Sequence, residues 1–453
     1  MSTTTKYTHR FLARFIIEAE TPLAVGSGDK DITTDRLVAR DVNDLPFIPA
    51  TSIAGVIRSM VKEKMSSKDF FGFQEGKDGH GSEIIFTDAQ ILNSKGAVVD
   101  GLKERTEWMN DPLLKEYGEL PIRQHVRIGA NGAADTKKYG KFDEQVVYAG
   151  TRFCFEMEAV ATSDTSTDFD AVKDALNDST FRLGGGTRKG FGAIRIVDTQ
   201  STILDLNEPA DLNRYLSKSS SLSDTTFWDM TLTPKDKRAA CGWTTYELTL
   251  SPRDFMLFGS GFGDEDADMT PVRARKVTWA NGKGSLTDEL VLIPATSVKG
   301  ALVHRVAFYW NKANGYFAGN AQAKTADNCP AVQALFGTAN GDDGKAHRGN
   351  VIFSDVLIKE STQNKVITHA CIDRFTGGVR NGALFTEKAT FASGVDITMT
   401  IHVKEEVVKE AESIAAFEAA LKDIATGTLP LGGGTNRGHG TFTGTIHKNG
   451  QSL

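Results

Sequence analysis

The stretch LGGGTRKGFG, residues 183–192, recurs near the end of the chain as LGGGTNRGHG, residues 431–440. Adjacent glycines let the backbone reach positive φ and carry no Cβ, so their amide N–H groups can face an anion. A cation stands at the same place in both loops, at Lys189 and Arg437, and Arg188 precedes the first. A tight turn explains one such loop equally well. Its repetition with the cation favours phosphate binding at Gly184, Gly185, Gly186, Gly432, Gly433 and Gly434.

Four further signatures precede each glycine loop in the same order. The first half contains TPLAVGSG (21–28), FIPATSIAG (47–55), IIFTDA (84–89) and RQHVRI (123–128). The second half contains FMLFGSG (255–261), LIPATSVKG (292–300), VIFSDV (351–356) and ITHACI (367–372). Because the order is kept while the spacing varies, we infer one fold present twice, with loops of different length.

A length of 453 residues fits two domains of about 200 residues each. We place the first domain at residues 8–199 and the second at 244–449. Residues 200–243 are rich in Ser, Thr, Asp and Lys and are predicted to be a linker with one short helix.

Each domain is predicted to be α+β. Phe11, Ala13, Phe15 and Ile17 alternate with other residues, which is typical of a strand, and apolar residues follow the IPATS motifs at helical spacing. The predicted order of strand–helix–strand–strand–helix–strand is that of two tandem ferredoxin-like domains.

The composition is that of a globular protein, with 40% hydrophobic and 24% charged residues. The net charge of −6 argues against nucleic-acid binding over the whole surface, but it permits a basic stripe on one face. No apolar run is long enough to span a membrane, and no secretory signal opens the chain. The cysteines lack zinc-binding spacing and are typical of reduced thiols in a cytoplasm: Cys154, Cys241, Cys329 and Cys371.

The starts of the IPATS helices are further candidate phosphate sites. A helix N-terminus offers free N–H groups and a positive dipole end, and ordinary capping is compatible with this role. Hydroxyls and cations near these starts are expected to contribute: Ser52, Arg58, Ser297, Lys299 and Arg305.

A histidine recurs within the fourth signature. His125 lies between Arg123 and Arg127, and His369 takes its place in the second copy. A histidine in a strand is more often packed and hydrogen-bonded than catalytic, although the general-base role remains open.

Two loop aspartates are candidate catalytic groups. Asp35 lies five residues before Arg40, and Asp268 lies five residues before Arg273. Such a carboxylate can orient a 2′-hydroxyl or hold a hydrated Mg²⁺ beside a bound phosphate. The second loop, DEDAD, is acidic enough to be merely solvated, and no HExxH or G-x-S-x-G motif signals a familiar hydrolase.

Together these motifs resemble the RAMP (repeat-associated mysterious protein) backbone subunits of type III CRISPR effector complexes. The match is fullest in the second copy, over residues 370–401, and the tandem arrangement resembles type III-D-like variants in which backbone subunits are joined. The resemblance implies an RRM-like palm that grips guide RNA, and a β-hairpin thumb. It also implies partnership with guide crRNA, complementary target RNA and other effector subunits, and no membrane.

The resemblance also implies that a loop aspartate cuts target RNA with a divalent cation, Mg²⁺ or another. The matching position is Asp35, and in the second copy Asp268, with Asp266 as a close competitor. The family's helix-start lysine falls on Lys299, whereas the first copy has Ala54. The implied RNA-binding residues are Ser52, Arg58, Arg123, His125, Arg127, Gly184, Gly185, Gly186, Arg188, Lys189, Ser297, Lys299, Arg305, Gly432, Gly433, Gly434 and Arg437.

The leading hypothesis is therefore a metal-dependent endoribonuclease acting within a complex. The alternatives are a non-catalytic crRNA-binding scaffold, a metal-independent guide-processing endoribonuclease with a histidine base, and an enzyme that binds a small phosphorylated ligand. The insertion KVTWANGKGSLTDELVL, residues 276–292, has no counterpart in the first copy and is predicted to be a lid or a contact with a neighbouring subunit.

Overall fold

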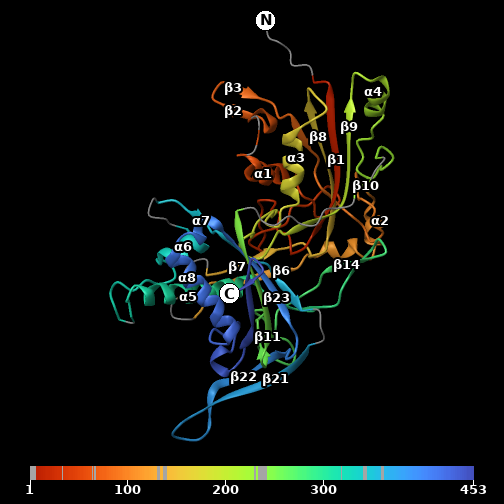
Figure 1. The fold of residues 1–453 in the computed structure, drawn as a ribbon. Coiled ribbons are helices and arrows are strands. Elements are labelled where there is room, and N and C mark those ends of the chain that lie inside the picture. Colours follow the sequence, from red (N-terminus) through yellow and green to blue (C-terminus); the bar gives the residue numbers. More distant parts are fainter. Residues whose placement is uncertain are drawn as a thin grey trace.

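The computed structural model describes residues 7–32, 34–63, 65, 68–129, 133–135, 140–228, 231–232, 242–317, 319–339, 344–358 and 362–453. Two α+β domains lie end to end, the first coloured red to yellow and the second green to blue (Figure 1). In each domain, two helices pack on one face of an antiparallel sheet. This confirms the predicted fold class.

The first domain has the strand order β9-β1-β8-β4, with β10 added beside β9. Its main elements are β1 (His9–Ala19), α1 (Ala50–Val61), β4 (Ile84–Phe86), β8 (Arg152–Ala161), α3 (Thr167–Leu176) and β9 (Ile194–Asp205). The first strand pairs with both β8 and β9, so it is a central strand, as in a ferredoxin-like sheet.

The second domain repeats this topology in the order β19-β23-β11-β24. Its main elements are β11 (Trp243–Pro252), α5 (Ala295–Ala313), β19 (Val351–Ile352), β23 (Ile397–Lys404), α8 (Ala411–Thr426) and β24 (Phe442–Lys448). Each strand therefore has an equivalent in the first domain, and β11 takes the central place of β1.

Shorter elements surround the two sheets. They are β2 (Phe73–Glu75), β3 (Asp78–His80), β5 (Gln90–Ile91), α2 (Arg105–Met109), β12 (Phe255–Met256), β13 (Arg273–Ala274), β16 (Leu290–Ile293), α6 (Pro330–Phe336), β17 (Gly337–Thr338), β18 (His347–Arg348), β20 (Val356–Ile358), α7 (Glu405–Val408) and β25 (Gln451–Ser452).

The alternation along β1 separates two packed faces. Phe11 and Phe15 join the core between the sheet and the helices, whereas Leu12 packs on the opposite face with Phe227 and Trp228. That opposite face is covered by the segment predicted to be a linker. It contains α4 (Pro209–Leu216) and β10 (Thr231–Leu232), which pairs with β9. Residues 229–230 and 233–241 of the predicted linker lie outside the described part of the chain.

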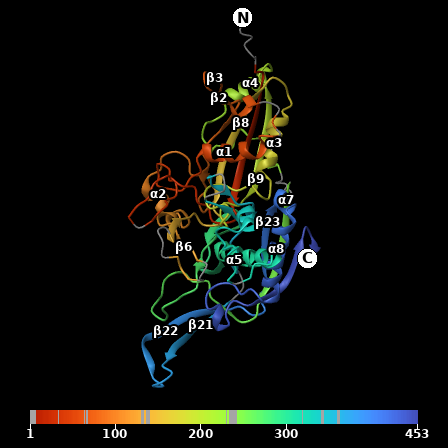
Figure 2. The ribbon, with the colours of Figure 1, turned by 90° about the vertical axis from the view of Figure 1, so that its left-hand side faces the viewer.

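Each domain carries a β-hairpin between its second and third core strands. The first is formed by β6 (Ile122–Val126) and β7 (Lys141–Gln145), and the second by β21 (Gln363–Ile372) and β22 (Val379–Phe391). The first hairpin lies against the second domain, whereas the second projects from the far end of the molecule (Figures 1 and 2).

The insertion predicted to be a lid or a neighbour contact forms the hairpin β14 (Val277–Ala280) and β15 (Lys283–Leu286). It packs on the first domain of the same chain. The Trp279 indole N–H donates to the Gly150 carbonyl at 2.8 Å, and Arg275 pairs with Glu116 at 2.8 Å. Among the described residues, no helix is both long enough and apolar enough to cross a membrane.

Candidate nucleic-acid interface

The first glycine loop lies in the junction between the two domains. Gly190 forms a parallel bridge with Ser354 of the second domain, and it has φ of 107°. A Cβ at Gly190 would lie 2.6 Å from the Ala295 Cβ atom, so only glycine permits this approach. The Arg188 Nε atom donates to the Gly349 carbonyl at 2.9 Å, which ties the loop to the second domain.

Three cations from the two domains meet at this junction. Arg188 and Lys189 come from the loop, and Lys299 comes from the first turns of α5. We call these three residues the seam cations. Burial, and after it repulsion from Lys189 and Arg188, lowers the pKa of Lys299 to about 8. Within the described part of the chain Lys299 has no ion-pair partner. The positive charge of the cluster is therefore not fully balanced by carboxylates of the protein.

The other two seam cations are partly satisfied by protein groups. Burial lowers the pKa of Arg188, with repulsion from Arg348 as the next cause. Burial also lowers the pKa of Lys189, which lies 3.9 Å from Glu144. Each keeps a partly exposed side chain. An anion entering the seam would therefore meet three positive groups whose repulsion it relieves.

The helix starts have an unexpected cap. The helices α1 and α5 begin directly after Pro49 and Pro294, and neither start has a side-chain cap from its own turn. Instead the Ala295 N–H donates to the Asp355 carboxylate at 2.9 Å. In the first domain the Ala50 N–H donates to Asp88 in the same way. Asp355 and Asp88 thus occupy the helix N-termini at which the sequence analysis predicted phosphate binding. Ser52 and Ser297 lie in the first turns, half-buried.

The arginines of the first hairpin form ion pairs across the domain junction. Arg123 lies 3.2 Å from the buried Asp355, and Arg127 lies 2.7 Å from Asp327. Both were predicted to bind RNA, and both are engaged with carboxylates of the second domain. Arg305, also predicted to bind RNA, pairs instead with Asp423 at the contact between α5 and α8, while Arg58 is exposed on α1.

A buried glutamate on the second strand of each hairpin was missed from the sequence. Glu387 accepts from His369 and His439 at 2.8 Å each and also binds Arg437. In the first domain Glu144 takes this place, 2.9 Å from His125. The signal that identifies both is the repeated Phe-x-Glu of FDE (142–144) and FTE (385–387), whose phenylalanine rings stack on the histidines.

These glutamates hold the cation of the glycine loop in place. Hydrogen bonds from Arg437 and the histidines hold the pKa of Glu387 below its usual range, although burial opposes them. His125 and His369 are thereby committed to a carboxylate and to a stacked ring. The arrangement fits the packed role that the sequence favoured for the recurring histidine.

Replacing Glu387 with glutamine should destabilise the protein by about 3 kcal/mol, because it breaks a buried ion pair while leaving the Arg437 charge in place. The measurement is the free energy of unfolding in urea. Asp170→Asn, which removes an exposed pair with Lys173, is the control and should cost less than about 1 kcal/mol. Equal losses for the two variants would show that Glu387 is not an anchor.

The two loop aspartates occupy equivalent positions at the second strand of each hairpin. The Asp143 N–H donates to the Asp35 carboxylate at 3.1 Å, and the Thr386 N–H donates to Asp268 at 2.7 Å. Asp266 instead lies 3.0 Å from Lys388 in an ion pair. The geometry thus matches Asp35 with Asp268.

The two aspartates differ in their surroundings. Thr386 also donates its hydroxyl to Asp268, and its hydrogen bonds lower the pKa of that carboxyl. Asp35 has the Asp143 carboxylate beside it, since Asp143 accepts from the Asp35 N–H at 2.9 Å. The partner of the loop aspartate is therefore a second carboxylate, Asp143, in the first domain and a threonine, Thr386, in the second.

The donor set of the first domain suits a hydrated divalent cation. Among the described residues, no group of three or more His, Cys, Asp and Glu side chains is placed to hold a metal ion. Mg²⁺, however, is commonly held by one or two carboxylates together with substrate phosphates. Asp35, which is exposed, and Asp143, which is half-buried, meet that requirement.

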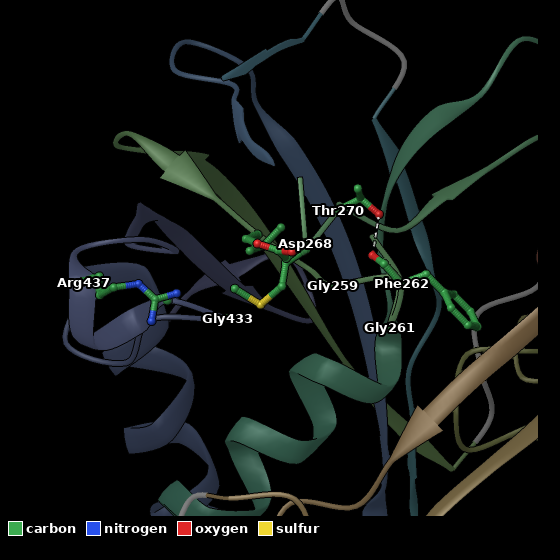
Figure 3. Close-up of a pocket in the computed structure, with 10 residues that line it drawn as sticks. Gly259, Gly261, Phe262, Asp268, Thr270, Gly433 and Arg437 are labelled. Atoms are coloured by element: carbon green, nitrogen blue, oxygen red, sulfur yellow. Dashed lines mark hydrogen bonds between the residues drawn. The ribbon is translucent and has the colours of Figure 1, made fainter. Parts of the chain in front are cut away.

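The second glycine loop borders an open pocket of about 370 Å³. Gly433, Gly434 and Arg437 line one side, and Asp268 and Phe262 lie across from them. Figure 3 shows Arg437 extending from the loop toward Asp268. This pocket brings a candidate phosphate-binding loop and a candidate catalytic carboxylate to one place. Gly432, which completes the triplet, packs against the Leu257 carbonyl.

Comparison with known proteins identifies the repeated unit. A family model described as the RAMP superfamily matches residues 16–195 and 271–443. The two matches fall one in each domain and together cover more than half of the chain. No curated protein matches the sequence.

Proposed function

Because the chain belongs to the RAMP superfamily, whose members are CRISPR-associated RNA-binding subunits, we propose that it is a tandem backbone subunit of a type III effector complex. RAMP proteins bind crRNA and other effector subunits. In this proposal both domains contact the guide, and loop aspartates cleave the complementary target RNA. The tandem form resembles the type III-D-like arrangement.

The seam cations carry the proposal for RNA binding. Arg188, Lys189 and Lys299 converge from two domains, and burial together with repulsion from Lys189 and Arg188 lowers the pKa of Lys299 to about 8. A row of phosphates supplies the negative charge that such a cluster lacks, and each neutralised phosphate releases counterions. This local stripe also reconciles RNA binding with a net charge of −6.

Guide binding through the seam should weaken as the pH rises. Lys299 loses its charge as the pH passes about 8, so its phosphate contact is lost and affinity should fall by up to about tenfold between pH 7 and pH 9. The folding stability of the free protein changes in the opposite sense. The unfolded lysine, with a pKa near 10.4, binds more protons than the folded one above pH 8, so stability rises with pH there.

The measurement for this pH dependence is the Kd for guide RNA at several pH values, with Lys299→Arg as the control. Arginine stays charged throughout this range, so the variant should show a much flatter profile. An identical profile for the two proteins would contradict the role of Lys299.

The cleavage proposal assigns roles to the loop carboxylates. Asp35, together with Asp143, would hold a hydrated divalent cation, which supplies charge neutralisation at the scissile phosphate. Asp35 would also orient the 2′-hydroxyl of the target strand and accept a hydrogen bond from it. Asp268 would act in the same way in the second domain, with Thr386 fixing its carboxylate.

One observation disfavours the metal-independent alternative. A guide-processing enzyme of that kind needs an accessible histidine base, whereas His125 is 2.9 Å from Glu144 and is buried. A non-catalytic scaffold remains the second candidate. The Asp268 carboxylate, already satisfied by Thr386, favours that role for the second domain.

The test assembles the complex with a guide and an end-labelled complementary RNA, with Mg²⁺ or with EDTA. The proposal expects discrete cuts that EDTA abolishes while target binding persists. Cutting that survives EDTA would support the metal-independent enzyme. Binding without any cut would support the scaffold, and failure to retain guide RNA would overturn the assignment.

A further inference from the structure

Lys299 faces the first glycine loop from across the domain junction. It lies four residues after Ala295 on α5, so the two side chains project from the same face of the helix. Ala295 packs against Gly190, where a Cβ atom would lie 2.6 Å from the Ala295 Cβ atom. The Lys299 amine is therefore held beside Arg188 and Lys189 of the loop, and both charges act on it.

The carboxylates at this junction have other partners. Asp355, at the start of α5, lies 3.2 Å from Arg123, and Glu144 lies 2.9 Å from His125. Neither forms an ion pair with Lys299 in the described part of the chain. The half-buried Lys299 amine thus lies among cations, with no carboxylate that would help it to keep its proton.

This environment favours the neutral, nucleophilic form of the Lys299 amine. With a pKa of about 8, about half of it is neutral at pH 8, whereas an ordinary lysine with a pKa near 10.4 is about 0.4% neutral at that pH. A less basic amine is intrinsically a weaker nucleophile, which by analogy with thiols offsets about tenfold of this gain of about 100-fold. A net advantage of about tenfold remains.

The other two seam cations can hold a phosphate group next to this amine. Of the acceptors in the described part of the chain, Arg188 contacts the Gly349 carbonyl through Nε and none through its terminal N–H groups. Lys189 lies 3.9 Å from Glu144, which is too far for a hydrogen bond. Both side chains are partly exposed. A guanidinium and an ammonium are the groups that bind phosphate oxygens most strongly in proteins.

We propose that Lys299 is a modification site that is acylated by acyl phosphates, in which an acyl group is joined to phosphate through oxygen. Arg188 and Lys189 hold the phosphate, and the neutral Lys299 amine attacks the acyl carbonyl carbon. An N–C bond forms and the C–O bond to phosphate breaks. The electron pair of that bond leaves with the phosphate, and the amine proton passes to water. The products are an uncharged Nε-acyl-lysine and inorganic phosphate.

The modification removes one of the three charges of the seam. It requires only the free chain and an acyl phosphate, so it does not rest on RNA being the molecule that binds there. A failure of this inference is therefore distinguishable from a failure to retain guide RNA.

The test exposes the full chain to acetyl phosphate at several pH values and follows each lysine by peptide mass spectrometry. Lys312, which is exposed near the other end of α5, is the internal reference. At about pH 8, acetylation of Lys299 should be about tenfold faster than that of Lys312, and its rate should level off at higher pH. Equal rates at the two lysines would overturn the proposal.

A second reagent separates the phosphate site from nucleophilicity alone. The succinimidyl ester of acetic acid carries no phosphate, so its preference for Lys299 over Lys312 should be at least about threefold smaller than that of acetyl phosphate. Equal preferences would overturn acyl phosphates as the donor. Lys189→Gln should bring the two preferences together, whereas Lys62→Gln, at an exposed lysine of the first domain, should leave them apart.

Competition provides the same test on the wild-type chain, in case Lys189→Gln lowers the unfolding temperature. Inorganic phosphate should slow the reaction of Lys299 with acetyl phosphate, relative to chloride at equal ionic strength, and should leave Lys312 unaffected. Equal slowing at both lysines would contradict a phosphate site beside Lys299.

Discussion

Replacing Asp35 with asparagine should remove one discrete cut from the target RNA, lowering its rate by about 100-fold or more. Asparagine keeps an oxygen for the Asp143 N–H, which lies 3.1 Å from the Asp35 carboxylate, so the loop should stay in place. The change therefore removes the charge that holds a cation and orients the 2′-hydroxyl, and little else. Guide and target binding should be unchanged.

The measurement is the pattern and rate of cleavage of an end-labelled target in the assembled complex with Mg²⁺. Asp29→Asn is the matched control, because Asp29 is an exposed carboxylate on the same loop. Asp268→Asn tests the second domain separately. If every cut survives when Asp35 and Asp268 are both replaced, the chain is a scaffold and a partner supplies the cleaving carboxylates.

Removing the seam cations should have the second large effect, on guide RNA affinity. Replacing Arg188, Lys189 and Lys299 together with glutamine should flatten the dependence of log Kd on log salt by about 2, at about 0.7 per lost contact with single-stranded RNA. Affinity should fall at low salt and converge toward wild type at high salt. The loss should be nearly independent of guide sequence, because phosphates carry no base identity.

The control removes the same charge from exposed positions elsewhere, through glutamine at Lys62, Lys409 and Lys422. It should leave the salt dependence close to that of wild type. The unfolding temperature is measured for both variants. A seam variant that unfolds earlier but binds RNA normally would assign the cluster to domain packing instead.

Much of the fold followed from local sequence. The alternation of Phe11, Ala13, Phe15 and Ile17 predicted a strand, and all four are buried in β1. The sequence also identified the insertion at residues 276–292, but it could not tell that Trp279 reaches Gly150 in the first domain. That contact depends on how the two domains pack against each other, and the local hydrophobic periodicity carries no information about this packing.

In the candidate site, too, some residues could be predicted from the sequence and others could not. Asp35 and Asp268 share a spacing to a later arginine, and the structure gives them equivalent backbone partners in Asp143 and Thr386. Glu387 was missed because a lone glutamate in a strand looks like a solvated residue. Its importance comes from His369, His439 and Arg437, which reach it from positions far apart in the sequence or across a strand pair.

By itself, the sequence determined that one α+β unit occurs twice. The hydrophobic periodicity, the glycine-rich loops and the order of the motifs can all be read directly from the linear sequence. Only the tertiary structure decided that the two copies are used differently. The loop with Gly190 is closed by the second domain, whereas the loop with Gly438 stays open. The physical reason is that a junction depends on matched charges and shapes on two surfaces, such as Arg123 with Asp355, and folding alone brings those surfaces together.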